Sequence, residues 1–329
     1  MTSTETAILD VSALEEAAEA IVPLPAAIAR LITVVNDPNV NVGAIVEIVR
    51  YDIGLTAALL RQANSAHYVA ARQVSDVRDA IVRLGLNTVL TVAMRSAVAA
   101  SLSGALEIYN LEGGDMYRHS VLSAVAADEI RMRRPNLVPS ITPTVALLHD
   151  VGKIVIAKAI GGRAVELVTS LATADGHAMH ETEVAVFGMH HGHAGAYVIR
   201  HWKLPNSFLD GIVNHHGSDA PPTFAAMGAQ LADELAHASE ALRAMRQARA
   251  AGQVEREEAA RQNADSPESD TTAFAESAEV FAEEPTPAVR PSEALVSLCE
   301  RFAFGADEIR ELIATSLDRY EDIRASLEQ

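Results

Sequence analysis

The chain has 329 residues, 49% of them apolar, so it is long enough to bury a sizeable hydrophobic core. Aromatic residues make up only 4% and alanine is abundant, which favours closely packed helices over sheets. The formal net charge of -18 excludes a broad basic surface for nucleic acids. The single cysteine, Cys299, excludes an intramolecular disulfide and a cysteine zinc finger, and it favours a reducing compartment.

The first residues carry no export pattern. Residues 1–20 contain acidic side chains and no basic segment ahead of an apolar one, and we expect residues 1–14 to form a tail. The most apolar stretch, 86–106, is interrupted by Arg95 and by several Ser and Thr residues, which predicts a buried core helix rather than a membrane span. We therefore expect a cytoplasmic protein with no membrane segment.

Two helical regions follow the tail. Residues 15–106 show apolar spacings of three and four, interrupted by prolines and by Gly54, which predicts a bundle of short helices. The same periodicity continues through 107–261, with breaks at further glycines and prolines. Because no repeat of 20 to 50 residues is visible, we predict one compact all-α domain over 15–261.

The last part of the chain divides in two. Residues 262–291 are rich in Asp, Glu, Ser, Thr, Ala and Pro, and such a segment buries too little apolar surface to offset its ordering entropy. We expect it to be an acidic, disordered insert. Apolar periodicity returns in 292–329, which predicts C-terminal helices that dock on the main body.

The strongest chemical signal is Leu147-Leu148-His149-Asp150-Val151-Gly152-Lys153, in which an apolar helix ends in an adjacent His and Asp. Neighbouring residues on a regular helix point about 100° apart, so both can face one metal only near a helix end or between helices. Gly152 can supply that irregularity. The alternative is a buried polar pair that caps the helix end through bonds to the backbone.

Further candidate ligands lie at intervals that fit separate helices: His119, the cluster His190, His191 and His193, the pair His215-His216, and Asp233. Asp115 and His119 lie four residues apart on one helix face, where both could reach the same ion. Imidazole and carboxylate ligands suit iron, manganese, nickel or zinc. Taken singly, each of these residues is more often a surface or a hydrogen-bonded core residue.

Such a site would suit phosphoester hydrolysis, in which a divalent ion activates water and Lys153 stabilises charge on the phosphoryl group. Asp150 and Lys153 would then be catalytic. Alternatively, Lys153 is a solvated charge at a helix start. No P-loop, G-x-S-x-G elbow or His-Glu-x-x-His motif offers a competing chemistry.

Several segments together resemble the HDOD domain, an all-helical relative of the HD and HD-GYP phosphohydrolases that is found in bacterial signalling. The resemblance covers roughly residues 15–240 and is carried by Pro23-Leu24-Pro25, Tyr51-Asp52-Ile53-Gly54-Leu55, Ala63-Asn64-Ser65, Ala80-Ile81-Val82-Arg83-Leu84-Gly85, Leu148 to Lys153, Gly188 to Ala196, Trp202-Lys203-Leu204-Pro205 and Asn214-His215-His216. Asp52-Ile53 departs from the family's usual Asp-Pro. The Gly-Tyr-Pro signature of cyclic-di-GMP phosphodiesterases does not follow His215-His216.

The resemblance implies an HD-like core over 107–261. It places the superfamily's metal positions on His119, His149, Asp150, His191, His215 or His216, and Asp233, with Lys153 in the basic position and Asp115 near a further acidic one. Many HDOD proteins lack a full metal set, whereas this chain keeps most of it. The residues alone do not choose among His190, His191 and His193.

Two functions follow as hypotheses. The first is a signalling module that binds regulatory proteins, with a nucleotide or a metal as a further ligand, and that has no catalytic activity. The second is a metal-dependent phosphohydrolase acting on a nucleotide or another phosphoester. Direct nucleic-acid binding is not expected, because the chain is acidic and shows no basic recognition helix.

Overall fold

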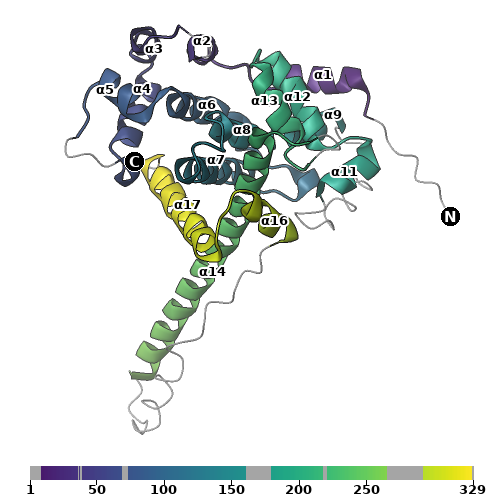
Figure 1. Ribbon diagram of the computed structural model, residues 1–329. Helices are drawn as coiled ribbons and strands as arrows, with labels where there is room; N and C mark the ends of the chain where they lie inside the picture. The colour runs from purple at the N-terminus through teal and green to yellow at the C-terminus, as the bar shows by residue number, and fades with distance from the viewer. Residues whose placement is uncertain are drawn as a thin grey trace, which may run out of the picture.

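The computed structural model describes residues 9–35, 37, 39–68, 73–160, 179–217, 221–264 and 292–327. Every named element among these residues is a helix, and the one β-bridge joins Leu106 to Leu111. Figure 1 shows short helices gathered around a core, with one long helix that extends away from it. The all-α class predicted from composition and periodicity is confirmed.

The N-terminal bundle consists of short helices connected by turns. Asp52 and Asp76 begin two of them, because each carboxylate accepts hydrogen bonds from backbone N–H groups of the first turn. Asp52 therefore starts its helix although Ile53 follows in place of proline. The bundle contains α2 (Ala26–Val35), α3 (Val42–Val49), α4 (Ile53–Ala63), the 3-10 turn η1 (Ala66–Tyr68), α5 (Val77–Leu84) and α6 (Leu86–Leu102).

The Asn64-Ser65 pair closes the end of helix α4. The Asn64 amide donates to the carbonyl oxygen of Val74 at 2.7 Å and accepts from the N–H of Val74 at 2.8 Å. The Ser65 hydroxyl donates to the Gln62 carbonyl oxygen at 2.8 Å. These are bonds to the backbone, so the pair holds the connection between α4 and α5 in place.

The second half of the fold is organised around helix α7 (Asp115–Arg133), which packs against α6, α8, α14 and α17. Its side chains are buried continuously from His119 to Ile130, as expected for a helix enclosed by others. The remaining elements are η2 (Glu107–Tyr109), α8 (Thr142–Leu148), α9 (Gly152–Ile160), α11 (Met179–Phe187), α12 (His191–His201), α13 (Asn206–Val213) and α14 (Phe224–Ala264).

The N-terminal boundary differs from the one expected. Residues 1–14 were expected to be a tail, yet helix α1 (Val11–Glu19) begins within them, with Asp10 as its N-cap. Leu14 is fully buried, and α1 packs against α9 and α12 rather than against the N-terminal bundle. The reason is apolar burial, since Leu14, Ala17 and Ala18 form one face that covers the second half.

The C-terminal helices α16 (Glu293–Arg301) and α17 (Ala306–Leu327) pack on the main body. Leu295, Leu298, Phe302 and Leu312 share a core with side chains of α7 and α14. Figure 1 shows α17 beside α7 and along part of α14. Helix α14 continues to Ala264, and the acidic insert expected at 262–291 otherwise falls outside the described residues.

Taken singly, no helix in the described part of the chain has both the length and the apolar character needed to cross a membrane. Helices α5 and α6 satisfy those criteria only when they are joined across a sharp bend. Both contribute side chains to the hydrophobic core, as predicted for the apolar stretch that begins at Leu86.

Candidate metal centre

The centre is built around the turn between α8 and α9. His149 follows the last residue of α8, and α9 begins at Gly152, so the chain changes direction at the His149-Asp150 pair. Gly152 permits a close approach of α9 to α12, because a Cβ there would lie 1.8 Å from the carbonyl oxygen of His191. This turn lets two adjacent residues face the same space.

A first cluster joins this turn to helices α7 and α14. His119 Nε2 lies 2.9 Å from Asp233 Oδ1. His149 Nε2 lies 3.5 Å from the same Asp233 oxygen and 3.6 Å from Asp150 Oδ1. The four side chains are almost completely buried. Residues more than 80 positions apart in the sequence therefore present their ligand atoms to one point.

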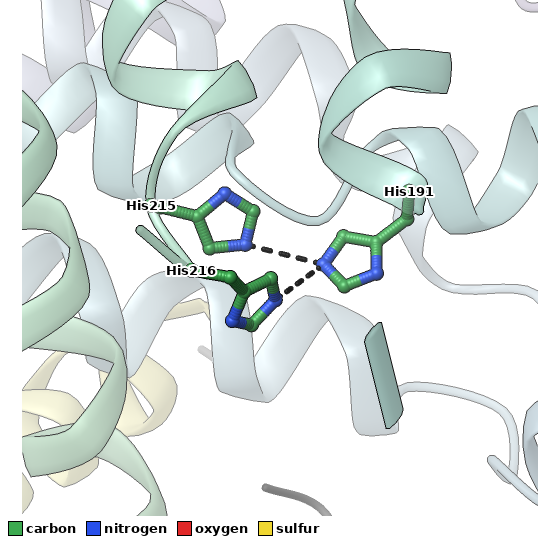
Figure 2. Close-up of side chains that lie close together, drawn as sticks. All are labelled: His191, His215 and His216. Carbon is green, nitrogen blue, oxygen red and sulfur yellow. Dashed lines mark hydrogen bonds between the residues drawn. The ribbon is translucent and has the colours of Figure 1, made fainter. Parts of the chain in front are cut away.

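A second cluster consists of His191, His215 and His216, and Figure 2 shows their rings converging from the start of α12 and the end of α13. His191 Nε2 lies 3.1 Å from His215 Nε2 and 2.9 Å from His216 Nε2. Asp150 Oδ1 lies 3.0 Å from His191 Nε2. Asp150 thus touches both clusters and could bridge two ions.

In three of the histidine rings, the Nδ1 atom, which points away from the centre, is held by a hydrogen bond. Nδ1 of His149 lies 2.6 Å from the Ala146 carbonyl oxygen, and Nδ1 of His215 lies 2.7 Å from that of Ile212. Nδ1 of His191 lies 2.6 Å from Glu183 Oε2. A ring that donates from Nδ1 keeps a lone pair on Nε2, which is the arrangement typical of histidine ligands of metals. In each case it is Nε2 that faces the centre.

The surroundings of one buried nitrogen atom indicate whether a metal fits the centre. His149 Nε2 is fully buried and has no hydrogen-bond partner among the residues that the structure describes. An unpartnered buried acceptor costs free energy, and such groups are rare in folded proteins. A divalent ion between His149, Asp150 and Asp233 would bind this lone pair, so the residues present fit a metal.

Charge within the centre is balanced by protons. Burial alone would lower the pKa of His191, but Glu183 and Asp150 outweigh it and raise that pKa to about 9. Burial also opposes protonation of His119, yet Asp233 and Glu240 raise its pKa to about 10. Without metal, both rings are therefore in the positively charged, doubly protonated form at neutral pH. Metal binding would release these protons.

The neighbouring groups stay in the forms that bind metal. Burial would raise the pKa of Asp150, but Lys153, His149 and His191 hold it well below its usual value. The pKa of His215 is lowered well below 6.5, first by burial and then by the positive charges of neighbouring histidines. Without metal, the centre thus combines charged carboxylates and the neutral ring of His215 with the protonated rings of His119 and His191.

Other predicted residues lie at the edge of the centre or outside it. Asp115 binds Arg118 at 2.9 Å and the N–H of Glu112 at 2.9 Å, and it belongs to neither cluster. His190 instead caps α12 through the N–H of Gly192, and His193 is exposed. Among the three clustered histidines, only His191 contributes to the centre. Lys153 Nζ lies 2.6 Å from Asp150 Oδ2.

Sequence reasoning missed the residues that support the ligands. Glu183 holds His191, and Glu240 lies 3.3 Å from Nδ1 of His119. His237 lies 3.4 Å from Asp233 Oδ1, and His180 stacks on His216 with ring centroids 4.3 Å apart. The only available signal was the spacing of Asp233, His237 and Glu240, which places them on one face of α14.

An all-helical fold around a His-Asp turn, with histidines and an aspartate converging from four other points, is a fold of the HD type. The chain belongs to the HDOD domain family, which matches residues 21–218. The earlier resemblance is thereby confirmed.

Solved structures share the fold at low sequence identity. A protein of Shewanella amazonensis SB2B named "Putative phosphohydrolase" is 22% identical, with a TM-score of 0.62 and coverage of 96% of this chain and 98% of the other. An HDOD domain protein of unknown function from Geobacter sulfurreducens is also 22% identical, with a TM-score of 0.57 and coverage of 97% and 99%.

A curated relative covers less of the chain. It is an uncharacterized protein of Treponema pallidum (strain Nichols), 22% identical over 203 residues, which are 60% of this chain and 38% of the relative. The chain thus spans about two fifths of the length of that relative.

Proposed function

We propose that this protein is a metal-binding regulatory module of bacterial signalling. The observation that carries the proposal is the convergence of imidazole Nε2 atoms and carboxylate oxygens on one buried centre, with the orphaned Nε2 of His149 inside it. The ligands would be His119, His149, Asp150 and Asp233 on one side, and Asp150, His191, His215 and His216 on the other. Membership of the HDOD family supports the signalling role.

The ligand chemistry selects among metals. The centre is rich in imidazole and has two carboxylates, which suits iron, manganese, nickel or zinc. Calcium and magnesium prefer oxygen ligands and are disfavoured here. A bound divalent ion would supply a Lewis acid and a fixed positive charge in a buried site. In a regulatory module, that charge would tie α7, α8, α12 and α14 together.

Burial favours binding over turnover. His149, His191 and His215 are at most 1% exposed, and Lys153 is engaged with Asp150 rather than directed at solvent. A centre enclosed in this way can hold an ion tightly while offering a substrate little access. We therefore propose cytoplasmic signalling or regulatory proteins as its partners, with a nucleotide as a possible ligand.

The second candidate function is a metal-dependent phosphohydrolase. It is favoured by one observation: Lys153 lies beside Asp150, and both Lys153 and His216 are only partly buried at the edge of the centre. Lys153 could bind a phosphate oxygen and neutralise its charge, while Asp150 holds the ammonium group in position. A nucleotide or another phosphoester would be the substrate.

The test is elemental analysis of protein purified without chelator or affinity-column metal. We expect near-stoichiometric metal in wild type and in the control His193→Ala, whose ring is exposed, and loss of metal in the variant His149→Ala, Asp150→Ala. A folded wild-type protein without metal would show the proposal to be wrong. Metal together with phosphoester turnover that Asp150→Asn abolishes would replace the regulatory module by the phosphohydrolase.

A further inference from the structure

A cavity separate from the metal centre lies between the N-terminal bundle and the C-terminal helix. Its volume is about 270 Å³, and its walls come from α4, α6 and α17. An adjoining cavity of about 30 Å³ shares Gln62, Arg95, Arg319 and Ile323 with it. None of the lining residues is a candidate metal ligand.

Three arginines line the larger cavity: Arg61 from α4, Arg95 from α6 and Arg319 from α17. Arg95 is partly buried, and it makes no hydrogen bond or ion pair with any residue that the structure describes. Burial lowers the pKa of Arg95, which outweighs the raising effect of Tyr117, and the positive charges of Arg61 and Arg319 lower it further. A desolvated cation without a counter-ion is unfavourable, so this wall of the cavity favours an anion.

Gln62 provides a second, independent observation. It is 9% exposed and lines both cavities, and its side-chain amide has no hydrogen-bond partner within the described ranges. The amide atoms of Gln62 are not among the fully buried atoms that lack a partner, so they remain accessible from the cavity. An oxygen of a bound ligand would accept from this amide while the guanidinium of Arg95 binds the same group.

Two of the other charged side chains around the cavity, Arg319 and Asp318, are already paired. Arg319 binds Asp128 at 3.0 Å and Glu129 at 2.6 Å. Asp318 on the rim binds Arg246 at 2.8 Å. Within the described part of the chain, the charged side chains that remain unpaired are the cations Arg61 and Arg95 and the anion Asp322, so the net unpaired charge at the cavity is positive.

We propose that this cavity binds the anionic group of a small metabolite, either a phosphate or a carboxylate, with Arg95 and Gln62 as its principal partners. The planar guanidinium can bind two oxygens of either group at once. The cavity volume is close to the lower end of known small-ligand pockets, about 300 Å³, so the ligand is small. Because Arg319 and Thr315 of α17 form one wall, a bound ligand would connect this helix to α4 and α6.

The test uses the full-length protein, stripped of metal by a chelator that is then dialysed away, so that the metal centre cannot hold the probe. Isothermal titration calorimetry is performed with inorganic phosphate and, separately, with malonate. We expect saturable binding of at least one probe, and the two titrations distinguish a phosphate ligand from a carboxylate ligand. We expect affinity to fall about tenfold or more in Arg95→Met, which keeps the apolar stem but removes the charge.

Matched variants make the result specific. Arg30→Met removes an exposed arginine of the same bundle that does not line the cavity, and it should bind as wild type does. The variant His149→Ala, Asp150→Ala should also bind normally. Ligand-dependent protection of α17 amides from hydrogen exchange should be seen in wild type and lost in Arg95→Met. Absence of saturable binding by both probes, or equal affinity in wild type and a folded Arg95→Met, would overturn the proposal.

Discussion

Glu183 Oε2 lies 2.6 Å from Nδ1 of His191 and 2.7 Å from its backbone nitrogen, so one carboxylate oxygen fixes both the ring and the start of helix α12. Such partners orient metal ligands and raise their basicity. We predict that Glu183→Gln, which keeps the shape but removes the charge, weakens metal binding by about 10- to 100-fold. Competition against a chromophoric chelator measures this change.

The control for that prediction is Glu181→Gln on the same helix, where the side chain is exposed and contacts neither cluster. It should bind metal as tightly as wild type. If Glu183→Gln also binds with wild-type affinity, then Glu183 does not orient a ligand.

Gly152 is required by the approach of α9 to α12. A Cβ at this position would meet the backbone of His191 and Gly195 at 1.8 Å and 2.5 Å, and backbone cannot move aside as a flexible side chain can. We predict that Gly152→Ala lowers the free energy of unfolding by about 3 kcal/mol or more, at the upper end of overpacking effects. Urea denaturation measures it. Gly252→Ala is the control, because its Cβ meets nothing within 4 Å and should stabilise helix α14 slightly.

Arg319 secures the C-terminal helix through Asp128 and Glu129 of α7, and all three side chains are at most 10% exposed. Without Arg319, Asp128 keeps its ion pair with Arg131 and Glu129 keeps its ion pair with Arg133, but each buried carboxylate loses one charged hydrogen bond. We predict that Arg319→Met costs about 2–3 kcal/mol and makes α17 sensitive to limited proteolysis. Arg310→Gln removes an exposed pair with Asp307 and should change stability by less than about 1 kcal/mol. Equal protease resistance of the two variants would contradict the prediction.

The same contact predicts how stability depends on pH. Burial would raise the pKa of Asp128, but Arg319 and Arg131 outweigh it, and the folded-state pKa lies below its ordinary value. A carboxylate with a lowered pKa contributes stability that is complete above its unfolded pKa of about 3.9 and is lost as pH falls through the folded value.

We therefore expect the stability difference between wild type and Asp128→Asn to be constant near neutral pH and to shrink below about pH 4. Urea midpoints measured for both proteins across this range test it. A difference that stays unchanged at low pH would show that Asp128 is not charged in the folded protein.

The sequence by itself determined the class of the fold and predicted most of the residues that the structure brings together at the candidate centre. Apolar periodicity with few aromatic residues predicted helices, because a helix must bury one face whatever its partner. The His149-Asp150 pair at a helix end and the motifs of the family identified residues that the structure brings together. Local rules suffice for such features, since a cap or a helix end depends on a few neighbouring residues, as Asp52 shows at the start of α4.

Only the tertiary structure decided which side chains meet. Three histidines lie within four residues, yet His191 alone faces the centre, because His190 is used as a cap and His193 points to solvent. Asp115 shares a helix face with His119 but forms an ion pair with Arg118 instead. Glu183 and Arg95 carry no sequence motif at all. Their roles depend on distances between helices far apart in the chain, and these distances are set by packing of the whole core.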